Sequence, residues 1–118
     1  MLLAGFSLGS ITALDTALQC APAQHVAGVL FMHGAPICVD EWAERLKHHP
    51  GLRVYMTAGQ ADMTLPHQTA GWVKQLLDAN GAKAEMHVHP GGHELGGPDV
   101  IRRIAKFVRE TLEFATKA

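Results

Sequence analysis

The chain has 118 residues, of which 47% are hydrophobic and 18% are charged, as in an ordinary globular protein of one modest domain. Its formal net charge is -1 and both signs are scattered, so the sequence offers neither a basic stripe for nucleic acid nor a block of like charge for an oppositely charged surface. No stretch approaches the roughly 20 apolar residues of a membrane span. The composition therefore argues against disorder, nucleic-acid binding and membrane spanning, and it favours a small-molecule or acyl substrate.

Four short apolar runs alternate with segments of helical periodicity. The second run is nearly all apolar, as in a strand that is buried on both faces of a sheet, and each run ends in a turn-forming cluster that contains glycine. The predicted strands are Met1–Ala4, Val26–Met32, Leu52–Thr57 and Ala84–His89. Strands that alternate with helices form a sheet with helices on its faces. We therefore predict an α/β fold, a three-layer sandwich around a mainly parallel sheet of about four strands.

The helical segments follow the strands in turn. The predicted helices are Ser10–Cys20, Glu41–His48, Gln68–Asn80 and residues 98 to about 116. Gly81 ends the third helix, and Asp40 is expected to cap the second. One strand, one helix and their connections take about 30 residues, so four such units use the whole chain. Residues 1–118 are accordingly predicted to form a single domain.

The two cysteines and the first residues bear on the cellular compartment. Cys20 and Cys38 lack CxxC spacing, and they predict small, buried, free thiols in a reducing compartment rather than a disulfide framework. Residues 1–4 have neither the basic region nor the long apolar run of an export signal. We therefore expect a cytoplasmic protein without a membrane anchor.

The first turn carries the motif Gly5-Phe6-Ser7-Leu8-Gly9, which satisfies G-x-S-x-G after an apolar strand and before a helical segment. This context is the one in which a serine hydroxyl projects from a tight strand-to-helix turn. Both glycines are expected to relieve crowding around the serine. Ser7 is therefore the candidate nucleophile; the alternative is that its hydroxyl merely caps the helix.

A serine hydroxyl is a weak nucleophile until a base takes its proton, so a histidine is needed at the same edge of the sheet. His93 follows the fourth predicted strand in the glycine-rich loop Pro90-Gly91-Gly92-His93, which makes it the candidate base. The other seven histidines flank helices or lie in or beside strands, and we expect them to be structural or exposed: His25, His33, His48, His49, His67, His87 and His89.

The imidazole needs a third group that fixes its tautomer and stabilises its charge. Asp62 lies in the loop beyond the third strand, at the position expected for this orienting acid. Glu94, next to the histidine, is a weaker competitor. The other aspartates lie on or at the ends of predicted helices: Asp15, Asp40, Asp78 and Asp99.

Ser7, Asp62 and His93 occur in the chain order associated with α/β-hydrolases. With Pro66 four residues after Asp62 and the run Gly91-Gly92-His93-Glu94, the chain resembles the phospholipase/carboxylesterase family, which includes acyl-protein thioesterases. The resemblance covers essentially all 118 residues, but only the second half of the family. It implies the C-terminal half of an α/β-hydrolase fold, a single partial domain without the N-terminal strands and the oxyanion loop.

The resemblance further implies a serine esterase that needs no cofactor and no metal and acts on carboxylic esters, thioesters or lysophospholipids through an acyl-serine intermediate. The catalytic triad carries over to Ser7, Asp62 and His93, and Leu8 would contribute its backbone N–H to the oxyanion hole. Leu8 stands where the family often has glutamine, and Ser10 where it often has glycine. These departures leave the substrate preference open.

In the implied fold, a second oxyanion donor comes from a loop after an earlier strand, and no residue precedes Met1 to provide it. The loss of one such donor typically costs about 10²- to 10³-fold in turnover. The outer edge of the first strand would also keep unpaired N–H and C=O groups, which invite pairing. We therefore expect this strand to pair in a homodimer or with a separate N-terminal half, unless the chain is a truncated product.

Two alternatives remain open. The first keeps the fold but treats the chain as a catalytically impaired hydrolase fragment or as a non-catalytic interaction module, because the oxyanion loop is absent. The second is metal binding through His87 and His89, which alternate onto one face of a strand, with or without His93. Two imidazoles without a clear third ligand are a thin signal, so acyl transfer is the leading hypothesis.

Overall fold

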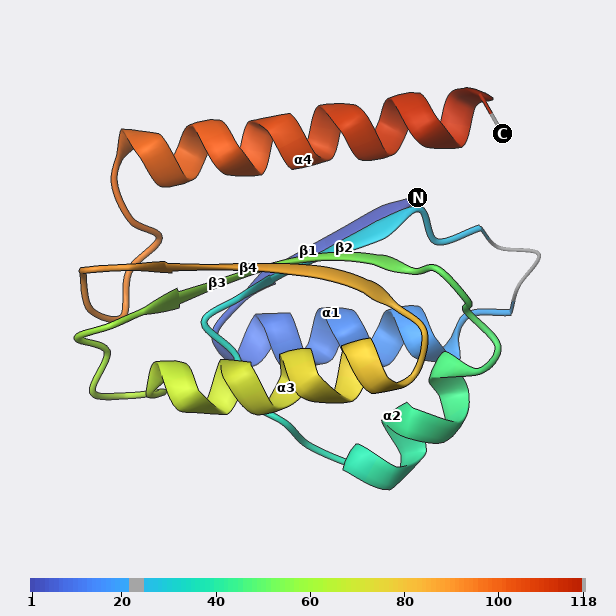
Figure 1. The fold of residues 1–118 in the computed structure, drawn as a ribbon, viewed down its shortest axis with the longest axis horizontal. Helices are drawn as coiled ribbons and strands as arrows, with labels where there is room; N and C mark the ends of the chain where they lie inside the picture. The colour runs from blue at the N-terminus through green and yellow to red at the C-terminus, as the bar shows by residue number, and fades with distance from the viewer. Residues whose placement is uncertain (22–24, 118) are drawn as a thin grey trace.

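The computed structural model describes residues 1–21 and 25–117, in which four strands and four helices alternate (Figure 1). The elements in chain order are β1 (Leu2–Phe6), α1 (Leu8–Gln19), β2 (Gly28–Met32), α2 (Val39–Leu46), β3 (Arg53–Gly59), α3 (His67–Ala79), β4 (Lys83–His89) and α4 (Pro98–Lys117). The predicted α/β alternation is confirmed.

The four strands form one sheet in the order β1-β2-β3-β4, and every neighbouring pair is parallel. The sheet is therefore wholly parallel within the described residues, where the sequence predicted a mainly parallel one. Because all strands run the same way, their carboxyl ends lie along one edge, at the left in Figure 1. The loops that follow β1, β2, β3 and β4 all leave the sheet at this edge.

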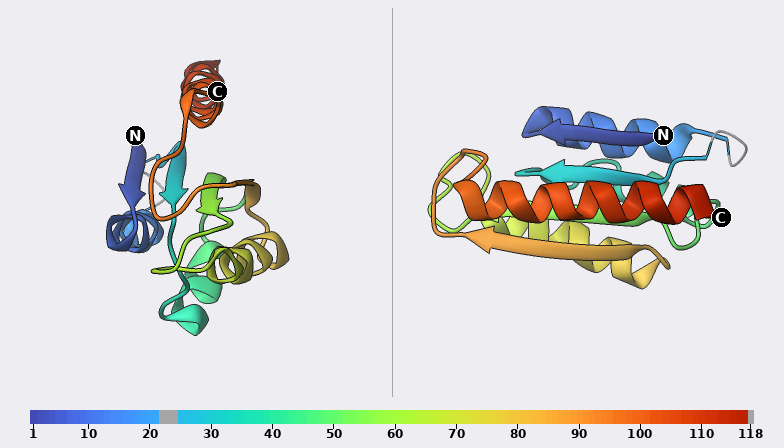
Figure 2. Two further views of the ribbon diagram at one scale, coloured as in Figure 1. Left: turned by 90° about the vertical axis from the view of Figure 1, so that its left-hand side faces the viewer. Right: turned by 90° about the horizontal axis from the view of Figure 1, so that it is seen from above.

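Helices cover both faces of the sheet, as the predicted three-layer sandwich requires (Figure 2). Helices α1 and α3 pack directly on one face, and α2 lies against these two helices. Helix α4 lies alone on the opposite face, against β3. Helices α1 and α3 bury apolar side chains against the sheet, and α4 does so with Phe107, which is how an amphipathic helix buries hydrophobic area.

The main core lies between the sheet and helices α1 to α3. Strand β2 is buried on both faces, as its all-apolar run predicted, and Val29 and Phe31 are fully buried in this core. A smaller cluster lies beneath α4, where Phe107 packs on Leu30 and Tyr55. The hydrophobic packing of the sheet is therefore more extensive on the side of α1 and α3 than on the side of α4.

Several element ends differ from the prediction. β1 runs to Phe6 and β3 to Gly59, because ladder pairing with the neighbouring strand continues into the glycine-containing turns. Helix α2 begins at Val39, two residues before its predicted start at Glu41: Cys38 takes the N-cap position with a left-handed φ of 48°, and Asp40 lies in the first helical turn. A carboxylate there still interacts favourably with the helix dipole.

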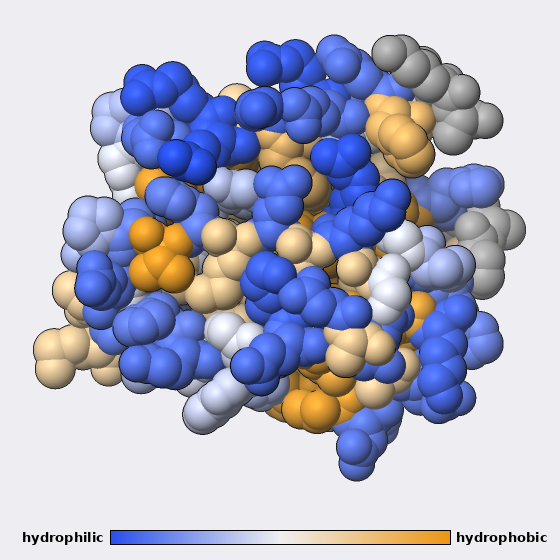
Figure 3. Space-filling model, in the orientation of Figure 1, coloured by the Kyte–Doolittle hydropathy of each residue, from blue (hydrophilic) through white to orange (hydrophobic). Residues whose placement is uncertain are grey.

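The next features of the fold are the two cysteines and the molecular surface. Cys20 and Cys38 are free, but Cys38 is exposed, so the expectation that both are buried is wrong. Hydrophilic residues surround smaller apolar areas on the face drawn in Figure 3. In the part of the chain that the structure describes, no helix combines the length and the apolar character needed to cross a membrane.

Trp42 joins α2 to α1. The side chain of Trp42 is fully buried in the main core, and its indole N–H donates a hydrogen bond of 3.0 Å to the carboxylate of Asp15 on α1. The same carboxylate accepts a hydrogen bond from Gln19. This pairing fixes how the short helix α2 sits on α1.

Trp42→Phe should lower the free energy of unfolding by about 1–3 kcal/mol, because it removes the donor to Asp15 and part of the buried ring area. Urea denaturation followed by circular dichroism measures the change. Trp72, which is 59% exposed, provides the matched control: Trp72→Phe should change the stability by less than about 0.5 kcal/mol. Equal effects of the two substitutions would contradict this assignment.

Candidate active site

Ser7 lies in the turn between β1 and α1, with φ 60° and ψ -125°. Its backbone N–H donates to the carbonyl of Met32 at 2.7 Å, which ties the turn to the end of β2. A Cβ on Gly5 would lie 2.0 Å from the carbonyl oxygen of Gly9, so only glycine fits at position 5. A Cβ on Gly9 would meet no described atom within 4 Å, so the predicted crowding holds for the first glycine only.

The hydroxyl of Ser7 does not cap α1. Although Ser7 occupies the N-cap position, it makes no side-chain cap hydrogen bond. Its Oγ lies 2.9 Å from Nε2 of His93 instead. The helix-capping alternative for this serine is therefore wrong, and the hydroxyl is directed at the imidazole.

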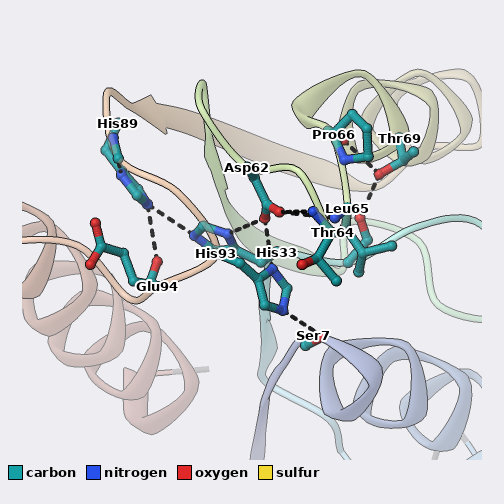
Figure 4. A network of polar contacts seen from close by, with 12 residues as sticks. Ser7, His33, Asp62, Thr64, Leu65, Pro66, Thr69, His89, His93 and Glu94 are labelled. Carbon is teal, nitrogen blue, oxygen red and sulfur yellow. Dashed lines mark hydrogen bonds and ion pairs between the residues drawn. The ribbon is translucent and has the colours of Figure 1, made fainter.

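Asp62 lies in the loop between β3 and α3, with its side chain fully buried. Its Oδ1 accepts hydrogen bonds from the backbone N–H groups of Thr64 at 2.8 Å and Leu65 at 2.9 Å. These two bonds form a local turn in which the aspartate side chain binds the backbone that follows it. The other oxygen, Oδ2, is thereby left to face the imidazole of His93 (Figure 4).

His93 reaches Asp62 through the loop that follows β4. Its Nδ1 lies 2.7 Å from Oδ2 of Asp62, so the carboxylate and the hydroxyl of Ser7 contact opposite nitrogens of one ring. Two backbone bonds join the two loops: Gln60 N–H donates to His89 O at 2.8 Å, and Ala61 N–H donates to Gly91 O at 3.0 Å. The structure thus brings together the three residues that the sequence singled out.

Two further histidines complete the cluster, and the sequence analysis treated both as structural or exposed. His33 follows β2 and is 1% exposed, and His89 ends β4 and is 4% exposed. His33 Nδ1 lies 3.1 Å from Oδ2 of Asp62, and its Nε2 lies 2.9 Å from Nε2 of His89. Both stand at the carboxyl ends of strands, and the argument that selected Asp62 and His93 applies to them equally.

The carboxylate at the centre of this cluster is strongly biased toward its ionised form. Burial alone raises the pKa of Asp62, but hydrogen bonds from His93 and His33 outweigh it. The backbone N–H groups of Leu65 and Thr64 add to them, and together these donors hold the pKa of Asp62 far below its usual value. Burial is also the main cause that lowers the pKa of His33, against the opposing hydrogen bond to Asp62.

The other candidate acids lie elsewhere. The residue Glu94 is exposed, and its backbone carbonyl, 3.1 Å from Nε2 of His89, is its contact with the cluster. Three aspartates lie on helices and have partners outside this cluster: Asp15 binds Trp42 and Gln19, Asp78 binds Lys74, and Asp99 binds Arg103.

One group of side chains has the composition of a metal site. His33, Asp62 and His93 each offer one ligand atom, and these atoms lie within 4.8 Å of one another. This set differs from the predicted His87, His89 and His93. His89 already accepts a hydrogen bond from the backbone N–H of Gly91 at 3.0 Å on Nδ1, and its Nε2 faces His33. Direct hydrogen bonds from both imidazoles to Oδ2 explain the closeness of His33, Asp62 and His93.

A family model described as phospholipase/carboxylesterase matches residues 1–112. Among proteins of curated function, none matches the sequence.

Solved structures similar to the chain include esterases and a thioesterase. Esterase PE8 is 22% identical with a TM-score of 0.82, and 93% of this chain covers 49% of that one. Acyl-protein thioesterase 2 of Zea mays is 21% identical with a TM-score of 0.71, and 92% of this chain covers 55% of that one. The Bacillus cereus carboxylesterase is 19% identical with a TM-score of 0.68, and 92% of this chain covers 49% of that one. At these identities the likeness shows the fold, and the chain spans about half the length of these structures.

Asp62→Asn should change how stability depends on pH. The folded-state pKa of Asp62 lies below that of an unfolded aspartate, so folding releases protons in the acidic range. This contribution is complete above about pH 5 and is lost as the pH falls through the folded-state pKa. The variant should therefore be less stable than the wild type near neutral pH, by about 1–3 kcal/mol, and the difference should shrink on acidification.

Urea denaturation at a series of pH values measures this difference. Asp78→Asn is the matched control, because Asp78 is exposed and forms an i,i+4 pair with Lys74; its effect should stay below about 0.5 kcal/mol. A difference between Asp62→Asn and the wild type that stays constant from neutral to strongly acidic pH would count against the network of donors around Asp62.

Proposed function

The chain belongs to the phospholipase/carboxylesterase family, and we propose that it is a serine hydrolase that cleaves carboxylic ester or thioester bonds through an acyl-Ser7 intermediate. The observation that carries the proposal is the chain of contacts from Ser7 Oγ through both ring nitrogens of His93 to the carboxylate of Asp62, at 2.9 and 2.7 Å. A serine, an imidazole and a buried carboxylate in this order are the parts that acyl transfer requires.

In the proposed acylation step, Nε2 of His93 takes the hydroxyl proton of Ser7 while Oγ attacks the carbonyl carbon of the ester. Asp62 accepts the Nδ1–H of His93, so the second nitrogen is free to act as the base. Because the pKa of Asp62 is far below its usual value, this acceptor stays ionised and stabilises the imidazolium that forms. The tetrahedral intermediate collapses, and the alcohol or thiol leaves with the proton from His93.

In the proposed deacylation step, a water molecule attacks the acyl-Ser7 carbonyl and gives its proton to His93. The second tetrahedral intermediate collapses, Ser7 recovers the proton, and the carboxylic acid leaves. Each bond that forms or breaks in this cycle involves only the substrate, water, Ser7 and His93. The proposed reaction therefore uses no cofactor.

We assign Leu8 as the oxyanion donor. Leu8 is the first residue of α1, and the N–H groups of a first helical turn have no partner within the helix. The positive end of the helix dipole lies at the same place, so negative charge on the carbonyl oxygen of the intermediate is favoured there. The side chain of Leu8 is 71% exposed and takes no part in this contact.

The outer edge of β1 is the second feature that we include in the proposal. Met1 O accepts from Ala27, and Ser7 N–H donates to Met32, so the odd-numbered residues of β1 bond β2 and the even-numbered ones face outward. Beside this edge lies an uncharged groove of about 380 Å³, lined by residues that include Leu3, Ala4 and Leu8. We propose that a further strand pairs with this edge and that its chain supplies the second oxyanion donor.

For the compartment, the two free cysteines support a reducing environment, and we propose the cytoplasm.

A fluorophosphonate probe should label Ser7, and peptide mass spectrometry should find no label on Ser10, whose side chain is buried. His93→Gln should slow labelling by about 10³-fold or more, because the hydroxyl loses its base, and Ser7→Ala should abolish it. His48 is exposed and remote from the cluster, so His48→Gln should label like the wild type. A folded chain that does not label, even when its β1 edge is paired, would favour the non-catalytic interaction module.

Amide hydrogen exchange tests the β1 edge. If a strand pairs there, the amides of Leu2, Ala4 and Phe6 should exchange as slowly as those of Leu3 and Gly5, and the mass in solution should exceed the 12.7 kDa of one chain. Fast exchange at Leu2, Ala4 and Phe6 alone, in a sample with the mass of a single chain, would contradict pairing of this edge.

A further inference from the structure

The proposed acyl transfer leaves two buried titratable side chains beside Asp62 unused, His33 and His89. His33 stands directly after β2 with a left-handed φ of 55°, and its backbone N–H donates to Thr57 O at 2.8 Å. Histidine tolerates this backbone region better than most residues do, but the conformation still costs energy. The turn directs a fully buried imidazole at the carboxylate of Asp62.

The contacts of His89 fix where the protons lie. The backbone N–H of Gly91 donates to Nδ1 of His89 at 3.0 Å, so this nitrogen carries no proton. A neutral His89 then has its proton on Nε2. This assignment agrees with the carbonyl oxygen of Glu94, which lies 3.1 Å from Nε2 and can only accept.

The tautomer of His33 follows from that of His89. The protonated Nε2 of His89 lies 2.9 Å from Nε2 of His33, so the latter must be an acceptor and carries no proton. The proton of a neutral His33 is therefore on Nδ1, which donates to Oδ2 of Asp62 at 3.1 Å. A second proton on His33 would have to lie on Nε2, where it would face the N–H of His89 across the 2.9 Å between the two nitrogens.

Oδ2 of Asp62 consequently accepts from two imidazoles, His33 at 3.1 Å and His93 at 2.7 Å, while Oδ1 accepts from two backbone N–H groups. Four donors fix the rotation of the carboxylate and spread its negative charge. The ring of Phe6 packs against both imidazoles, with its centroid 5.1 Å from that of His33 and 5.0 Å from that of His93. Figure 4 shows the carboxylate between the two rings.

We propose that His33 is a positioning residue of the active site: held neutral by His89, it donates a second imidazole N–H to Asp62 and so limits how strongly the carboxylate retains a proton on His93. The proposal rests on the proposed function. The chain of hydrogen bonds is then longer than a triad: it joins Gly91 N–H, His89 and His33 to Asp62, which also binds His93, and His93 binds Ser7.

A carboxylate with one donor fewer binds an imidazolium more strongly, so loss of the donor from His33 should move the acidic limb of the pH profile to higher pH. Two titratable groups contact this carboxylate, His33 after β2 and His93 in the loop after β4, and His89 at the end of β4 contacts His33. Glu94 is nearby but exposed. The acidic limb of the pH profile therefore reports on the donor from His33.

The experiment compares His33→Asn with His33→Phe in the full chain. The side-chain N–H of asparagine stands as many bonds from Cβ as Nδ1 does, and asparagine tolerates a left-handed backbone. Phenylalanine has a ring of similar size but no donor. His87→Asn is the matched control, because His87 lies on β4 and takes no part in the hydrogen bonds described above.

The first readout is the rate of fluorophosphonate labelling as a function of pH. For His33→Phe, the acidic limb should move to higher pH by about half a unit to one unit, whereas His33→Asn and His87→Asn should stay within about 0.2 units of the wild type. A profile of His33→Phe that coincides with the wild type would overturn the proposal. Zinc chloride and a chelator are added in parallel samples, so that a metal held by His33, Asp62 and His93 is recognised by its effect on the wild type.

The second readout does not depend on activity. Nitrogen-15 spectra of the histidine rings in the wild type should show His33 with a protonated Nδ1 and an unprotonated Nε2, unchanged from about pH 7 to pH 9. An Nε2–H tautomer, or a His33 that takes up a proton in this range, would overturn the proposal even if His33→Phe does not fold. Absent labelling together with the expected tautomer would instead refute the proposed function and leave the hydrogen bond in place.

Discussion

The parallel register of the four strands is the constraint on which the candidate site depends. Phe6 pairs with Met32, Met32 with Thr57, and Gly59 with His89, so β1 and β2 end together, and β3 and β4 end together two residues further on. The cross-strand bonds continue one residue beyond three of these ends: Ser7 N–H binds Met32, His33 N–H binds Thr57, and Gln60 N–H binds His89. Residues that are far apart in the sequence are thereby held at the spacing of neighbouring strands.

The site also concentrates features that a protein core normally avoids. Asp62 places a carboxylate in a fully buried position, which is tolerable only because four donors surround it. Ser7 and His33 both have positive φ, and each is fixed by a backbone bond to the neighbouring strand. Backbone strain and buried charge of this kind cluster at functional sites. They persist because the surrounding structure holds these residues in place and the rest of the core supplies enough stability to offset their cost.

The sequence predicted the element order, the parallel sheet and the three residues Ser7, Asp62 and His93 at its edge, because glycine-rich turns after apolar runs are visible in a sequence. It did not predict the roles of His33 and His89. Those roles depend on the direction of the two side chains. The left-handed backbone of His33 after β2 directs one imidazole, and the hydrogen bond from the backbone N–H of Gly91 orients His89. Several element ends differ from the prediction by one or two residues. For the strands the reason is similar, because the ladder bonds that extend them are tertiary contacts.

The central claim is that Ser7 carries the acyl group, and its most direct measurement is mass spectrometry of the chain quenched in acid during turnover of p-nitrophenyl butyrate. If Ser7 is the nucleophile, a transient adduct with the mass of one butyryl group should appear on the peptide that contains Ser7 before steady release of butyrate, and it should be lost in Ser7→Ala. Hydrolysis at the same rate in both proteins, or an adduct on a lysine or histidine elsewhere, would contradict it.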